Sequence, residues 1–155
     1  MARKGQAAME FLMTYGWAIL VVLVAIGALA YFGVLNPDTF LPEKCVISSG
    51  SGLFCDKFSV SSGTSIQLKV SNSLAEAVTL EASGSSISQG ANSCTLAADT
   101  AVTADNSSTL TFSGGGTCAT LTASGAKIKG DITLVFTDSD GFSKTTTGSL
   151  VAKAP

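Results

Sequence analysis

The sequence predicts an α+β protein in which a long hydrophobic α-helix at the N-terminus precedes an immunoglobulin-like antiparallel β-sandwich. Two observations support this fold class. The chain has no charged residue from Phe11 to Pro37, which is typical of a helix in an apolar environment. Beyond Lys44, apolar residues alternate with polar ones, as in half-buried strands. We therefore expect a leader at 1–5, a helix at 6–36, a linker at 37–43 and a sandwich at 44–155.

The first five residues form a short basic leader with Arg3 and Lys4. A secretory signal peptide has its apolar region before the cleavage point. Here the apolar region follows the candidate cleavage point between Gly5 and Gln6, so the cleaved chain would keep its helix.

The predicted helix begins with good helix formers and is apolar on every face. At about 1.5 Å per residue it is long enough to cross a hydrocarbon layer of roughly 30 Å. Such a helix must be surrounded by lipid or by other helices. Small residues that would permit close helix packing, or that are simply common in spanning helices, are Ala25, Gly27, Ala28, Ala30 and Gly33. The Asn36-Pro37 pair is expected to end the helix.

Glu10 is a lone carboxylate at the head of this apolar segment. Desolvating a carboxylate is costly unless a cation meets it. Two interpretations stay open. Glu10 lies at a membrane interface, solvated or paired with Lys4, or it pairs with the new α-amine of Gln6 on a neighbouring subunit after cleavage.

The order Lys4-Gly5-Gln6, then Glu10-Phe11, then a long apolar run resembles the class III signal peptide of archaeal type IV pilin-like proteins. The resemblance implies that a membrane aspartyl prepilin peptidase cuts between Gly5 and Gln6. It also implies a lollipop-shaped subunit that leaves the cytoplasmic membrane for an extracellular filament, with the helices inside and the sandwiches outside. Gln6, Glu10 and Phe11 would serve assembly, and the other partners would be an assembly ATPase and a platform membrane protein.

The remainder of the chain is about the size of one domain and is rich in short alternating segments. Turn-forming Gly and Ser clusters separate about seven expected strands. The last two strands should form a hairpin that turns at Asp138-Ser139-Asp140-Gly141, a sequence that also resembles the opening of a calcium loop but lacks its downstream glutamate. Residues expected in the core are Ile66, Leu68, Val70, Val78, Leu80, Leu110, Phe112, Ile132, Leu134 and Phe136.

The four cysteines form an even set with wide spacings, and the chain has no histidine. A zinc site would need all four thiolates at unusual spacings, so disulfides and an oxidising exterior are favoured over a metal. Three connectivities are possible. We favour Cys45–Cys55 with Cys94–Cys118, because each bridge would close a local loop or hairpin.

Composition argues against several functions. The net charge is -2 and the lysines are scattered along the sequence, which disfavours a nucleic-acid partner. Without histidine or paired carboxylates, the usual general bases are missing, so we expect no catalytic residue, no cofactor and no enzyme activity. Asn106-Ser107-Ser108 is a candidate glycosylation sequon.

The leading hypothesis is a structural subunit, a major pilin, of an adhesive archaeal type IV pilus-like filament that polymerises through its helix. A minor pilin is a variant of the same hypothesis. One alternative is a membrane-anchored extracellular binding domain that does not polymerise. Another is an archaellin, although archaellins typically lack the glutamine-to-glutamate signature.

Overall fold

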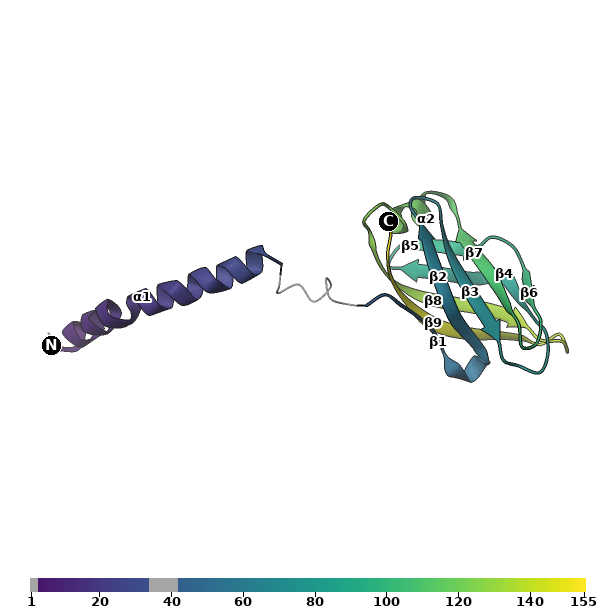
Figure 1. Cartoon of the computed structure of the whole chain (residues 1–155), viewed down its shortest axis with the longest axis horizontal. Coiled ribbons are helices and arrows are strands. Elements are labelled where there is room, and N and C mark those ends of the chain that lie inside the picture. The colour runs from purple at the N-terminus through teal and green to yellow at the C-terminus, as the bar shows by residue number, and fades with distance from the viewer. Residues whose placement is uncertain (1–2, 34–41) are drawn as a thin grey trace. The chain divides into compact units, whose positions relative to one another are not determined.

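The computed structural model describes residues 3–33 and 42–155 (Figure 1). The chain divides into two compact units, Met1–Leu41 and Pro42–Pro155. The first unit contains one long helix and the second contains the strands, so the predicted order of an apolar helix followed by a mostly β domain is confirmed. Each unit is described separately.

The N-terminal unit is the helix α1 (Arg3–Tyr31). Its bounds differ from the predicted 6–36, because α1 starts inside the predicted leader and ends before Asn36-Pro37. After Tyr31 the amide of Gly33 donates to the carbonyl of Ala30 at 3.1 Å. Gly33 has a φ of 68°, a left-handed conformation that glycine adopts readily at a helix end. The predicted Asn36-Pro37 stop and most of the predicted linker lie outside the described residues.

The second unit, called the head, contains nine strands and two short helices. More strands are present than the seven or so predicted, because very short strands such as the three-residue β6 give too little alternation to recognise. The strands are β1 (Lys44–Ile47), β2 (Leu53–Ser61), β3 (Ser65–Asn72), β4 (Val78–Gln89), β5 (Asn92–Leu96), β6 (Thr100–Val102), β7 (Ser107–Ser113), β8 (Lys127–Thr137) and β9 (Ser143–Lys153). The helices are the 3₁₀-helix η2 (Ser49–Ser51) and α2 (Gly115–Leu121).

All strand pairs of the head are antiparallel, in the order β1-β9-β8-β4-β5-β7-β3-β2, with β6 beside β4. The ladder between β8 and β9 runs from Lys127 opposite Lys153 to Thr137 opposite Ser143. The chain therefore turns between Thr137 and Ser143, and the predicted final hairpin is confirmed.

The core of the head is built from alternate residues of its strands. The ten residues predicted for the core are all buried, and each apolar side chain removed from water contributes about 1.5–3 kcal/mol. The curved sheet encloses this core, an arrangement compatible with a sandwich or a near-barrel (Figure 1). Asn72 is a buried polar residue within it, and its side-chain amide donates to the carbonyls of Glu76 and Val102 at 2.8 and 3.1 Å.

A disulfide joins the two ends of the strand order. β1 and β2 each pair with one strand and not with each other, yet Cys45 in β1 is bonded to Cys55 in β2, with 5.9 Å between their Cα atoms. We call the junction between β1 and β2 the seam. The head therefore closes on itself through a covalent bond where its backbone ladder is missing.

The second disulfide joins Cys94 in β5 to Cys118 in α2. It fixes this short helix, which by itself is too short to be stable in water, against the sheet. Both pairings match those favoured from the sequence, and all four cysteines are paired.

We predict that the two bridges act on different parts of the head. Each stabilises it by about 3 kcal/mol through the loop that it closes. Replacing Cys45 and Cys55 by alanine should in addition speed hydrogen exchange at Val46 and Phe54, because the seam has no ladder to hold β1 beside β2. The matched control, alanine at Cys94 and Cys118, should leave exchange at the seam unchanged. Equal exchange at the seam in both variants would contradict this role.

Candidate membrane and assembly helix, and other candidate sites

The helix α1 is long and apolar enough to cross a membrane. The span Gly5–Tyr31 has 27 residues and a mean hydropathy of 2.2, which corresponds to a length of about 40 Å at 1.5 Å per residue. Its large side chains are exposed, for example Leu12 at 60%, Trp17 at 70% and Leu23 at 64%. Within the described part of the N-terminal unit, nothing covers the apolar surface of α1.

The small residues of α1 lie on two sides of the helix. Because an α-helix has 3.6 residues per turn, Ala25 and Ala28 share one side, whereas Gly27 and Ala30 share a nearly opposite one. Gly33 lies beyond the end of α1, so it does not belong to either pair. Two opposite approaches for neighbouring backbones suit a helix that is packed from several sides better than a helix with one partner.

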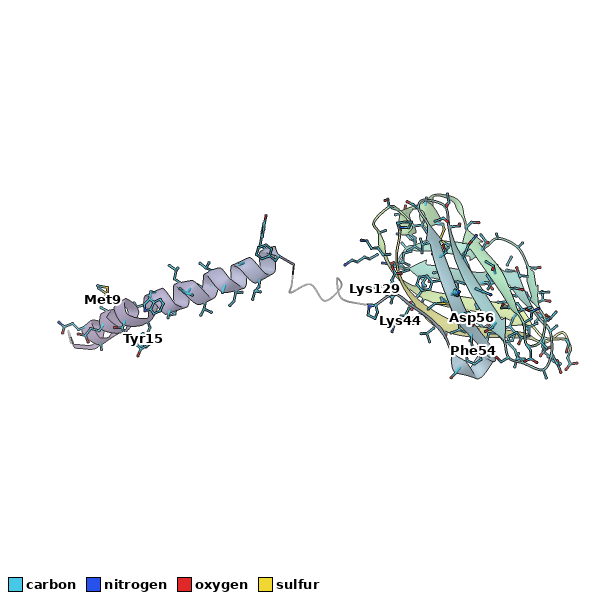
Figure 2. All side chains as sticks on the ribbon, in the orientation of Figure 1. Met9, Tyr15, Lys44, Phe54, Asp56 and Lys129 are labelled. Atoms are coloured by element: carbon cyan, nitrogen blue, oxygen red, sulfur yellow. A yellow bond between two sulfur atoms is a disulfide. The ribbon has the colours of Figure 1, made fainter. Side chains whose placement is uncertain are left out.

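Larger side chains of α1 surround a shallow apolar groove. The rings of Phe11 and Tyr15 are stacked with a tilt, their centroids 4.8 Å apart, and Figure 2 shows Tyr15 projecting from the helix. Ala18, which has a small side chain, lines the groove next to them. The lining residues are all apolar or aromatic, namely Phe11, Tyr15, Ala18, Ile19, Val22 and Leu23.

Glu10 is exposed and is the one charged residue of the span Gly5–Tyr31. The hydroxyl of Thr14 donates to the backbone carbonyl of Glu10 at 2.8 Å. The side-chain carboxylate of Glu10 takes no part in this hydrogen bond. Gln6 is exposed one turn earlier on the same side of the helix. The Gly5–Gln6 bond, the predicted cleavage point, lies in the first turns of α1, while the side chain of Lys4 lies outside the described part.

The turn between β8 and β9 is held by Asp138, whose carboxylate accepts the amide of Phe142 at 2.8 Å and pairs with Lys144 at 2.9 Å. The hydrogen bonds from Lys144 and Phe142 lower the pKa of Asp138, and the bond with Asp138 raises the pKa of Lys144. Asp138 thus stabilises the turn that was favoured over a calcium loop. Within residues 3–33 and 42–155, no group of three or more His, Cys, Asp or Glu side chains could hold a metal ion.

The candidate glycosylation residue Asn106 is exposed just before β7. Its side-chain oxygen accepts the amide of Ser107 at 2.8 Å, and the hydroxyl of Ser108 donates to the carbonyl of Ala101 at 3.2 Å. The side chain is reachable from solvent, and glycosylation there stays a prediction.

Two surface features of the head were missed by the sequence reasoning. One is a depression at the seam, lined by Glu43, Lys44, Cys45, Cys55, Asp56, Lys57 and Phe58. The other is Phe142, which is 68% exposed at the β8–β9 turn. The depression could not be predicted from the sequence, because only the strand order brings β1 beside β2. Phe142 could have been noticed in the sequence, because it is a lone apolar residue in an acidic turn.

Comparison of the chain with models of protein families and with curated proteins finds no match. The apolar N-terminal helix suggests membrane anchoring or a signal, and the two disulfides suggest an extracellular environment.

We predict that Asp138 titrates below the usual value of about 3.8, because its charged form is bonded in the folded state. The stabilisation is present above the ordinary pKa and is lost as the pH falls through the lowered one. An NMR titration of its carboxyl carbon checks this. Asp138→Asn should speed amide exchange in the turn at neutral pH, whereas Asp140→Asn is the matched control. A midpoint at or above 3.8 would contradict the bonding described.

Proposed function

We propose that this chain is a structural subunit, a major pilin, of an archaeal type IV pilus-like adhesive filament. The observation that carries the proposal is the exposed apolar surface on all sides of α1, together with the order Lys4-Gly5-Gln6, then Glu10-Phe11, at the start of this helix. The disulfide-bonded head supports an extracellular location. The precursor resides in the cytoplasmic membrane, and the mature chain resides in the filament.

Polymerisation in this proposal is an exchange of neighbours around α1. Lipid tails are as apolar as the side chains of α1, so the hydrophobic effect gives little drive for leaving the membrane. The drive comes from close packing, for which Ala25 with Ala28 and Gly27 with Ala30 offer two opposite sides, and from a partner for Glu10. The energy for extraction comes from the assembly ATPase and reaches the subunit through the platform membrane protein.

Cleavage between Gly5 and Gln6 supplies the missing cation in this proposal. It removes the leader and leaves a positive α-amine on Gln6, one helical turn from Glu10. In a staggered array of helices, the amine of one copy pairs with the carboxylate of the next. Prepilin peptidase must open the first turn of α1 to reach the bond, and Gly5 helps, because glycine is about 1 kcal/mol less favourable than alanine in a helix.

The proposal predicts the mass of the subunit in filaments. Filaments sheared from cells and purified should contain this chain as the dominant protein, starting at Gln6 when measured by intact-protein mass spectrometry. A substitution of Gly5 by a bulky residue should leave the leader attached and the chain in the membrane. Mature chains that retain Met1 would overturn the processing step.

A second prediction concerns the charge of Glu10. Glu10→Gln keeps the size of the side chain but removes the charge, so membrane levels should stay normal while the yield of filaments falls at least about tenfold, the factor that corresponds to about 1.4 kcal/mol of lost pairing. Thr14→Ala is the matched control one turn away and should polymerise normally. Normal filaments from the Glu10→Gln chain would remove this role.

A further inference from the structure

The depression at the seam is a concave surface at the place where the sheet lacks a ladder. It has a volume of about 530 Å³ and is open to solvent. A bulge in β2 at Asp56 interrupts the pairing with β3 next to the bridge. Val46 and Phe54, exposed at 50% and 41%, point outward beside the disulfide, and Figure 2 labels Phe54 on this part of the head. The seam therefore combines a hollow with apolar surface that no other part of the head covers.

The surroundings of the depression are rich in lysine, although the lysines are scattered in the sequence. Lys44 and Lys57 line it together with two carboxylates, Glu43 and Asp56. Lys44 lies opposite Val151 of β9, and Val151 lies opposite Lys129 of β8. The register therefore places Lys44 and Lys129 in one row across the sheet. Apart from Lys144 at the far end of β9, the exposed lysines of the surrounding strands are Lys44, Lys57, Lys69, Lys127, Lys129 and Lys153, and the exposed carboxylates of these strands and of the residue before β1 are Glu43, Asp56 and Asp131. This face has an excess of positive charge.

The β8–β9 turn has the opposite character. We call Asp138–Phe142 the hairpin tip. The amide of Asp138 donates to the carbonyl of Phe142 at 3.1 Å, and the amide of Gly141 donates to the carbonyl of Asp138 at 3.1 Å. Together with the Asp138 carboxylate, these bonds order the backbone of the turn that carries the exposed Phe142, so little backbone entropy is lost when a partner buries the aromatic ring.

Acidic side chains lie in the hairpin tip and next to it. Asp140 is part of the tip, and the hydroxyl of Ser139 donates to the carboxylate of Glu76 in the neighbouring β3–β4 loop. Lys144 is the one nearby cation that the structure describes, and it is paired with Asp138. The hairpin tip thus presents an aromatic anchor in a negative setting, which is complementary to the hollow and the lysines of the seam.

The hairpin tip cannot reach the seam of its own head. Lys44 in β1 lies opposite Val151 of β9, and the tip directly precedes Ser143 at the other end of β9. Eight residues at about 3.3 Å per residue separate these levels by roughly 26 Å, and Figure 1 shows the turn at the end of the head away from the start of β1. The two surfaces can therefore meet only between copies.

We propose that the hairpin tip of one copy docks into the seam depression of a second copy, with Phe142 in the hollow and the acidic side chains against Lys44 and Lys57. The two surfaces differ, so the contact is head-to-tail, and repetition of such a contact gives an open filament when the rotation does not close a ring. Aromatic anchors in central pockets carry much of the energy of protein interfaces. This inference rests on the proposed function, to which it adds a contact between heads.

A photo-cross-linking experiment tests the contact directly. The full chain carries p-benzoylphenylalanine in place of Phe142 and is irradiated in filaments and, separately, in cell membranes. Mass spectrometry should find the cross-link in peptides that contain Glu43–Cys45 or Cys55–Phe58 of another copy. The control carries the same probe at Thr109, an exposed position in β7, and should not label these peptides. Cross-links from position 142 to α1, to other parts of the head or to nothing would overturn the docking.

Charge reversal supplies a second test. Asp140→Lys and Lys57→Glu should each lower filament recovery at least about threefold at low salt, where the exposed charges are least screened, and the double variant should restore recovery to within about twofold of the original chain. Lys127→Glu, an exposed lysine that does not line the depression, is the matched control. Unaffected single variants, or a double variant no better than the worse single one, would overturn the docking. If filaments form normally although the docking is overturned, the proposed function stands. If this chain is absent from filaments, the proposed function is overturned, and the cross-link in membranes alone decides whether the docking occurs.

Discussion

The need to cover the surface of α1 is the constraint on which the rest of the structure depends. A helix that is apolar on every side has no stable place in water, and the described head buries its own core without help from it. The span Gly5–Tyr31 must therefore lie in lipid or among other helices. Its two opposite pairs of small residues and its single carboxylate are compatible with both environments at different times. This double compatibility is what a subunit that moves from a membrane into a filament requires.

The head meets a different constraint, because the extracellular environment that its disulfides suggest would expose it to solvent and proteases. Its sheet has two terminal strands, and unpaired strand edges invite uncontrolled pairing with other chains. The Cys45–Cys55 bridge holds these two edges together. Because a disulfide and not a continuous ladder joins β1 to β2, a hollow remains at the seam. The bond that closes the head therefore also leaves the surface for which we propose a partner.

Much of this architecture could be predicted from the sequence, for identifiable reasons. Period-two alternation located core residues such as Leu68 and Ile132, because burial on one face of a strand is a local property. The disulfide pairs followed from loop closure. The end of α1 was misplaced, because Gly33 ends the helix through its own backbone conformation before the proline signal at Pro37. The seam and the grouping of the lysines depend on which distant strands become neighbours, which periodicity does not encode.

The central claim is that α1 exchanges lipid for other copies of itself. Electron cryo-microscopy of filaments purified from the cell surface tests it most directly. The account predicts a core of packed α1 helices along the filament axis, without lipid between them, and a surface made of the disulfide-bonded heads. Filaments built from a different protein, while this chain remains in the membrane as a lipid-surrounded anchor, would contradict it.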